Sequence, residues 1–124
     1  MILRLLLGAA LVLTVAALPS AAAATEPPKN LRCPSADLRY PFRAGLPNDF
    51  GVWRLKVTRG TCATAHRVAA AWQRRFEASP TATLPRRVRG FRFRQLPPNA
   101  AQTYRLRGTR EATVVRFDYM VPNG

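Results

Sequence analysis

Few residues in this chain of 124 have the types and spacing that could do chemistry. Cys62 and His66 stand four positions apart, so on a helix they would share a face and could pair as thiolate and imidazole for nucleophilic catalysis. Such a pair needs a reduced Cys62, whereas Cys33 is present as an oxidation partner. We therefore interpret His66 as an ordinary, half-exposed histidine and predict no catalytic residue.

Metal and cofactor sites have no support in the sequence either. One histidine and two cysteines, Cys33 and Cys62, match no compact zinc spacing. The six carboxylates are scattered singly, and neither a Walker nor a dinucleotide-binding glycine pattern is present. We expect no metal and no cofactor, and a hydrolase with an unrecognised site is kept as an alternative.

Cationic side chains are the most abundant chemically functional groups in the sequence. The chain has 20 Lys and Arg against 6 Asp and Glu, a formal net charge of +14. Seven cations alternate with apolar neighbours, which predicts that they share the solvent face of one sheet: Arg54, Lys56, Arg92, Arg94, Arg105, Arg107 and Arg116. Guanidinium forks on such a face suit phosphate or carboxylate groups. The alternative is a solvated face whose arginine stems cover apolar atoms.

The expected partner of this face is an anionic cell-envelope polymer, a lipid surface or an acidic protein. Nucleic acid fits less well, because the aromatic residues that would stack on bases are predicted on the opposite face: Phe91, Phe93, Tyr104 and Phe117. A non-enzymatic binding module is the leading hypothesis. The second hypothesis is a secreted inhibitor or interaction protein that binds an extracellular enzyme through the proline-rich loop 31–49. The third is the hydrolase.

The first 24 residues have the order of a signal peptide. Arg4 supplies a positive charge, residues 5–18 are apolar, and small residues lead to a cleavage point near Ala24. The apolar run is shorter than the roughly 20 residues of a spanning helix. No cysteine lies at the cleavage point to carry a lipid anchor. We expect an extracytoplasmic protein with no retained membrane anchor and, after loss of Arg4, a net charge of +13.

The expected compartment determines how the two cysteines are interpreted. Cys33 and Cys62 are the only 2 cysteines, and oxidising conditions outside the cytoplasm favour a disulfide between them. Closing a loop of about 30 residues would stabilise the fold by roughly 3–4 kcal/mol in the chain-entropy model. Two free structural thiols are the alternative.

Hydrophobic periodicity predicts the elements that position these residues. Alternation indicates strands near 53–57, 89–94, 104–107 and 113–119, with Trp53, Leu55 and Val57 on the inner face of the first strand and a turn containing Gly108-Thr109 before the last. Apolar residues spaced three and four apart predict a helix over 62–76, with Thr61 as its N-cap.

Together these elements predict one α+β domain. The order favours a small antiparallel sheet of about four strands with one amphipathic helix packed on it. Residues 25–32 contain two prolines and are predicted as a flexible lead-in, so the basic, disulfide-stapled domain should span 33–124.

Residues 60–72 read G-T-C-A-T-A-H-R-V-A-A-A-W, and shorter related stretches lie at 88–93 and 114–117. The chain resembles a largely uncharacterised group of small secreted cysteine-containing proteins of high-GC bacteria. Their pattern looks like G-[ST]-C-x-x-A-x-x-V-A-x-x-[WY], then G-[FW]-x-C, then a strand ending in a further cysteine. This chain has Phe93 and Phe117 at the third and fourth cysteine positions.

The resemblance carries implications of its own. It implies that Cys33 and Cys62 are the remaining pair, and that Phe93 and Phe117 pack against each other across the sheet in place of a bond. It further implies a shared fold and compartment. It implies no reaction.

Overall fold

The computed structural model describes residues 10–15, 29–98 and 102–122. The predicted signal peptide, residues 1–24, lies outside these ranges apart from residues 10–15, so cleavage near Ala24 stays a prediction. Within the described ranges, no helix is both long enough and apolar enough to cross a bilayer.

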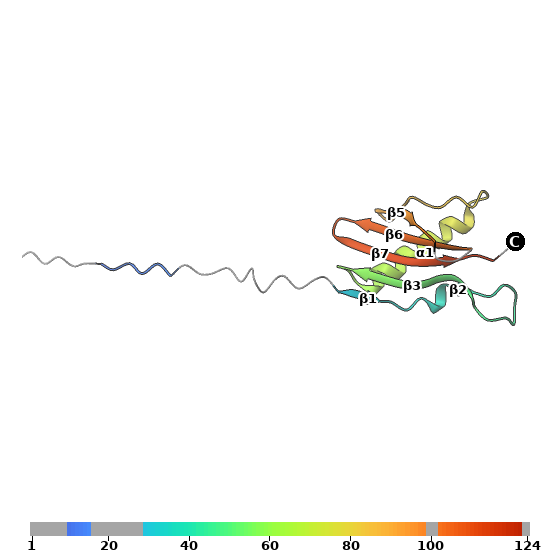
Figure 1. Ribbon diagram of the computed structural model, residues 1–124, viewed down its shortest axis with the longest axis horizontal. Coiled ribbons are helices and arrows are strands. Elements are labelled where there is room, and N and C mark those ends of the chain that lie inside the picture. The colour runs from blue at the N-terminus through green and yellow to red at the C-terminus, as the bar shows by residue number, and fades with distance from the viewer. Residues whose placement is uncertain (1–9, 16–28, 99–101, 123–124) are drawn as a thin grey trace, which may run out of the picture.

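In the described residues, one α-helix packs on one face of a seven-stranded antiparallel sheet (Figure 1). The elements in chain order are β1 (Asn30–Arg32), the 3-10 turn η2 (Ala36–Leu38), β2 (Arg39–Tyr40), β3 (Phe50–Thr58), α1 (Cys62–Ala78), β4 (Arg87–Val88), β5 (Phe91–Leu96), β6 (Thr103–Arg110) and β7 (Thr113–Met120). The strand order is β1-β3-β7-β6-β5-β4, and β2 pairs with β3 beside β1.

The predicted α+β class with one helix and an antiparallel sheet is confirmed, but the sheet has seven strands rather than about four. The strands without a sequence signal are β1, β2 and β4, which are two or three residues long and too short for alternation to show. Strand pairing also begins earlier than the predicted domain start at residue 33, because Asn30 in β1 pairs with Thr58. Residues 30–32 of the predicted flexible lead-in are therefore a strand.

The helix α1 follows its prediction closely. The Thr61 side chain accepts a hydrogen bond from the Thr64 N–H, which is the N-cap interaction expected. The helix ends at Ala78, slightly beyond the predicted 62–76, before Ser79 and Pro80. Its buried apolar side consists of Ala65, Val68, Ala69, Trp72 and Phe76. This side packs on the sheet through edge-on ring contacts of Trp72.

A β-bulge in β3 overturns one prediction. The pairing with β7 shifts register between Trp53 and Lys56, and Arg54 adopts a φ of 53° there. Leu55 lies buried beneath the helix, as expected. Trp53, however, lies opposite Asp118 on the face away from α1. The predicted inner position of Trp53 is wrong because the bulge interrupts the two-residue period.

Gly108 lies inside β6 rather than in a turn, which corrects a second prediction. β6 and β7 pair continuously as far as Arg110 opposite Thr113. A Cβ at Gly108 would lie 2.6 Å from the Phe93 ring, so the glycine makes room for that ring. Phe93 then reaches Phe117 with ring centroids 5.9 Å apart, the contact that the resemblance implied.

The predicted disulfide between Cys33 and Cys62 is confirmed. It joins the chain just after β1 to the first turn of α1, with the two Cα atoms 5.2 Å apart. The Cys33 N–H also donates to the Leu55 carbonyl at 2.8 Å, which fixes this segment against β3. The sulfur of Cys62 is therefore engaged in a bond, and the two-thiol alternative is excluded.

Candidate anion-binding face

The sheet has one face covered by α1 and one face that no element of the described residues covers (Figure 1). In antiparallel pairs, residues directly opposite each other project to the same face. Pairing across the sheet, together with the bulge at Arg54, brings all seven sequence-predicted cations to the uncovered face.

Four of these cations, joined by Arg32, form a continuous line across the sheet. Arg32 pairs with Lys56, Lys56 with Arg116, Arg116 with Arg107, and Arg107 with Arg94. We call these five residues the cationic row. Neighbouring strands lie about 4.8 Å apart, so the row extends over roughly 19 Å across β1, β3, β7, β6 and β5.

The other three predicted cations lie beside the row. Arg92 pairs with Thr109. Arg54 and Arg105 hold Asp118, which is the only carboxylate in the described strands. The Arg54 Nη1 atom is 2.8 Å from Asp118 Oδ2, and the Arg105 Nε atom is 3.7 Å from Oδ1. Asp118 is thus neutralised by these two arginines and not by the row.

The row itself lacks compensating charge. Among the described residues, no carboxylate lies within ion-pair distance of a row side chain. The Nε atom of Arg107 is buried and has no hydrogen-bond partner there. Like charges directly opposite each other destabilise a sheet. The row therefore leaves a line of unmatched positive charge on the open face.

A notch opens at the β1 end of the row. β1 and β2 pair with different parts of β3, and the chain between them carries Ser35 and η2 toward α1. The resulting pocket has a volume of about 330 Å³. Its lining consists of Arg32, Cys33, Arg39, Arg54, Leu55 and Lys56. We call this pocket the notch.

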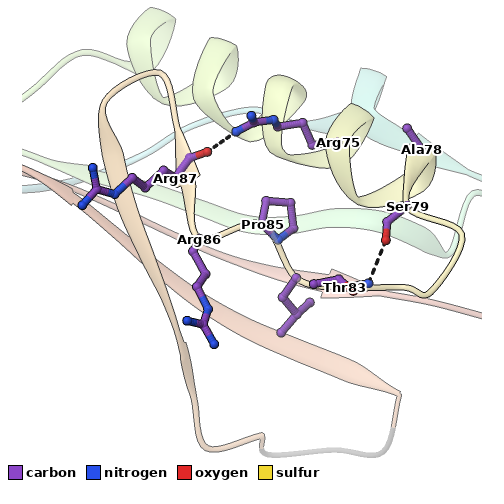
Figure 2. A pocket seen from close by; sticks show the side chains of 8 residues that line it. Arg75, Ala78, Ser79, Thr83, Pro85, Arg86 and Arg87 are labelled. Carbon is purple, nitrogen blue, oxygen red and sulfur yellow. Dashed lines mark hydrogen bonds between the residues drawn. The ribbon is translucent and has the colours of Figure 1, made fainter.

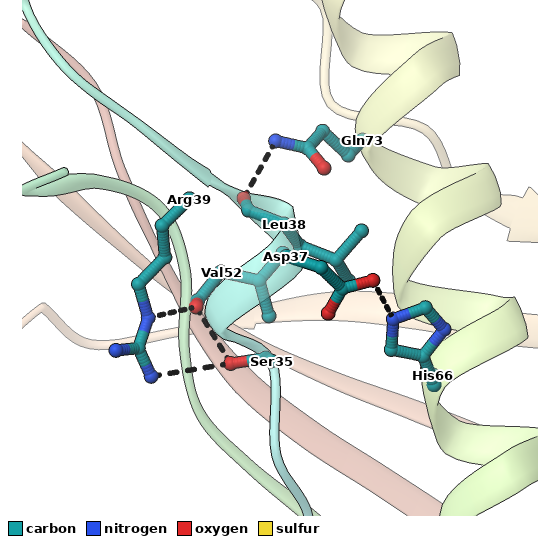
Figure 3. A network of polar contacts seen from close by, with 7 residues as sticks. All are labelled: Ser35, Asp37, Leu38, Arg39, Val52, His66 and Gln73. Atoms are coloured by element: carbon teal, nitrogen blue, oxygen red, sulfur yellow. Dashed lines mark hydrogen bonds and ion pairs between the residues drawn. The ribbon is translucent and has the colours of Figure 1, made fainter.

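Polar contacts around Ser35 fix the position of Arg39 (Figure 3). The Arg39 Nε atom donates to the Val52 carbonyl at 3.2 Å, and its Nη2 atom donates to Ser35 Oγ at 3.4 Å. Ser35 is buried and its hydroxyl donates to the same carbonyl at 2.8 Å. The Arg39 guanidinium carbon also lies 3.7 Å from the centre of the Trp53 ring.

Contacts with α1 anchor η2 behind this network. The His66 Nε2 atom lies 2.6 Å from Asp37 Oδ2, and Gln73 Nε2 donates to the Leu38 carbonyl at 3.0 Å (Figure 3). His66 therefore pairs with a carboxylate of η2 rather than with Cys62. This contact joins α1 to η2, which directly precedes Arg39 at the start of β2.

Another basic pocket lies beside the C-terminal end of α1, lined partly by Arg75, Arg86 and Arg87 (Figure 2). Its volume is about 600 Å³. Arg75 donates to the Arg87 carbonyl, and the guanidinium groups of Arg86 and Arg87 point away from each other. The guanidinium groups of Arg86 and Arg87 therefore do not converge on one point in this pocket.

Sequence reasoning missed Arg32, Arg39 and Trp53. Arg32 and Arg39 belong to strands of two or three residues, which give no periodic signal. Trp53 reaches the open face because of the bulge. The positive φ of Arg54, which accompanies that bulge, has no marker in the sequence since the residue is not glycine.

Comparison with known proteins supplies no relative from which a function could be transferred. No family model matches the chain, and no curated protein or solved structure matches it significantly. The functional argument therefore rests on the geometry and charge of the described residues.

Proposed function

We propose that the protein is an exported, non-enzymatic binding module whose cationic row holds an extended phosphate-bearing polymer of the cell envelope. One observation carries this proposal: five cations stand side by side across five strands of the open face, with no carboxylate of the described residues paired to them. A bound polyanion would offset the repulsion that the fold leaves in place.

The shape of the row favours an extended polymer over a compact anion. Its cations are arranged in a line of about 19 Å, set by the strand spacing, whereas a small anion would contact only two or three of them. Four of the five are arginines, whose planar forks bind phosphate oxygens in pairs. Repeating phosphates along a flexible chain match this pattern.

Export of the chain belongs to the same proposal. The order of charge, apolar run and small residues in 1–24 supports it, as does the disulfide, which is typical of oxidising compartments. The resemblance to small secreted bacterial proteins points the same way. Outside the membrane, the mature chain would meet the anionic polymers of the envelope.

A second candidate function is an interaction protein that uses the loop between β2 and β3. This loop exposes Phe42 and Leu46, whose relative exposures are 56% and 45%. Prolines at 41 and 47 stiffen it. Binding of a protein partner at this loop would weaken on replacement of Phe42 and Leu46 by serine. Substitutions in the row would leave that binding unchanged.

Binding of long linear polyphosphate at physiological ionic strength tests the proposal. The row variant Arg107→Gln/Arg116→Gln is compared by calorimetric titration with the control Arg43→Gln/Arg67→Gln, which removes the same charge from exposed residues outside the row. We expect the row variant to lose about tenfold in affinity or more. The control should change by less than about twofold.

Two results would overturn the proposal. One is an absence of polyphosphate binding by the wild-type protein. The other is an equal loss in the row variant and the control, because net charge alone would then explain the attraction. Circular dichroism of each variant establishes that its fold is intact.

A further inference from the structure

We propose that the notch binds a single dianionic phosphate group, the terminal phosphomonoester of the polymer held by the cationic row; the identity of that polymer rests on the proposed function. The site itself stands on its own observations. It is a pocket of about 330 Å³ with four cationic side chains and no carboxylate in its lining.

The four cations come from three strands and meet at one place. Arg32 belongs to β1, Arg39 to β2, and both Arg54 and Lys56 to β3. The bulge gives Arg54 its φ of 53° and allows it to project on the same face as Lys56, two residues later. The local backbone therefore concentrates charge in the notch.

Two of these arginines are held in place before any ligand arrives. Arg39 is fixed by Val52, Ser35 and the Trp53 ring, and Arg54 is fixed by Asp118. Each guanidinium has five N–H donors, so donors remain for a ligand on both side chains. Binding by pre-positioned side chains loses less conformational entropy.

Arg54 is paired with Asp118, but the other three cations of the notch have no ion pair in the described residues, so charge balance favours a chain end over an internal phosphate. A phosphomonoester carries a charge of about −1.5 to −2 at neutral pH, whereas an internal phosphodiester carries one negative charge. The notch lies at the edge of the sheet, and Arg32 and Lys56 belong to both the notch and the row. A polymer could therefore place its terminal group in the notch and extend its chain along the row.

Trp53 offers a signal for this site. The chain has 2 tryptophans, and Trp72 is fully buried in the core. Trp53 is half-buried on the open face and stacks on Arg39, which lines the notch. An anion that engages Arg39 should change the emission of Trp53 and leave that of Trp72 constant.

The probes for this test are methyl phosphate, a monoester, and dimethyl phosphate, a diester, titrated into the full chain. We expect a saturable change in Trp53 emission with methyl phosphate and at least about tenfold weaker binding of dimethyl phosphate. Phosphorus NMR titration follows binding where a variant alters the fluorescence.

Matched single variants separate the notch from general electrostatic attraction. Arg39→Gln should weaken methyl phosphate binding about tenfold. Arg67→Gln removes one charge from an exposed position on α1, outside both the row and the notch, and should leave that binding unchanged within about twofold. Arg32→Gln is the second notch variant, since the Arg32 side chain is exposed at the sheet edge and its loss leaves the core intact.

Equal binding of the two esters, or equal losses in Arg39→Gln and Arg67→Gln, would overturn the notch site. Failure of the two proposals can be distinguished. Polyphosphate binding without methyl phosphate binding would refute the phosphate site in the notch and keep the proposal for the cationic row. Methyl phosphate binding that depends on Arg39, without polyphosphate binding, keeps the phosphate site and removes the polymer function.

Discussion

Gly108 and Phe93 show how one missing side chain shapes the core. The Phe93 ring occupies the space above Gly108, and it thereby reaches Phe117 across β6. A glycine inside a strand weakens it unless something uses the space. Here the aromatic ring uses it.

Gly108→Ala tests this packing. Because its Cβ would lie 2.6 Å from ring atoms of Phe93, we expect a loss of about 1–3 kcal/mol in the free energy of unfolding. The measurement is urea denaturation. The double variant Gly108→Ala/Phe93→Leu should recover part of the loss relative to the sum of the single changes. Additive losses would contradict the account.

Tyr119 provides a test by pH. Its side chain is fully buried beside α1 and its hydroxyl donates to Glu77 Oε1 at 2.9 Å. Burial, the largest cause, raises the pKa of this phenol well above its ordinary value. Above a pH of about 10 the unfolded chain loses the proton and the folded chain keeps it. Stability should therefore fall as pH rises through this range.

The slope from this one group should steepen above pH 10 toward a limit of about −1.4 kcal/mol per pH unit, which is approached near pH 11. Urea denaturation between pH 9 and pH 11.5, in steps of roughly half a unit, measures it for the wild type and for Tyr119→Phe. The variant should be less stable at neutral pH but should have the shallower alkaline slope. An identical alkaline slope in both proteins would contradict the assignment.

At the scale of elements, the cationic row predicts a stability cost. Arg116 lies between Lys56 and Arg107, so it takes part in two like-charge pairs. Arg116→Gln should raise the free energy of unfolding at low ionic strength by roughly 0.2–1 kcal/mol. The gain should vanish at high salt because screening removes the repulsion.

Arg67→Gln is the control for this prediction. Arg67 is exposed on α1, away from the open sheet face. Its replacement by glutamine removes the same formal charge as Arg116→Gln. Thermal unfolding at several salt concentrations compares the two variants. If Arg116→Gln stabilises no more than Arg67→Gln, or destabilises, the row carries no internal repulsion.

The elements that could be predicted from the sequence are the long ones. α1 and the strands β3, β5, β6 and β7 have enough residues for their periods to show. The bulge at Arg54 and the position of Gly108 depend on contacts with neighbouring strands, Asp118 in one case and Phe93 in the other. The local hydrophobic pattern of the sequence carries no information about contacts between strands that are distant along the chain.

At the scale of the whole molecule, the asymmetry of the fold creates the candidate site. One helix covers one face of the sheet (Figure 1). The disulfide attaches the edge that carries β1 to that helix. The alternation of charge with apolar residues was sufficient to predict one cationic face. The row and the notch could not be predicted, because both depend on Arg32 and on which strands are neighbours.

The salt dependence of polyphosphate binding tests the central claim most directly. If five row cations each displace counterions as on a single-stranded polyanion, the slope of log K against log salt is about −3.5. Arg107→Gln/Arg116→Gln should make the slope shallower by about 1.4, and Arg43→Gln/Arg67→Gln should leave it unchanged. A slope that is unchanged in the row variant, or reduced equally in both variants, would contradict the cationic row as the binding surface.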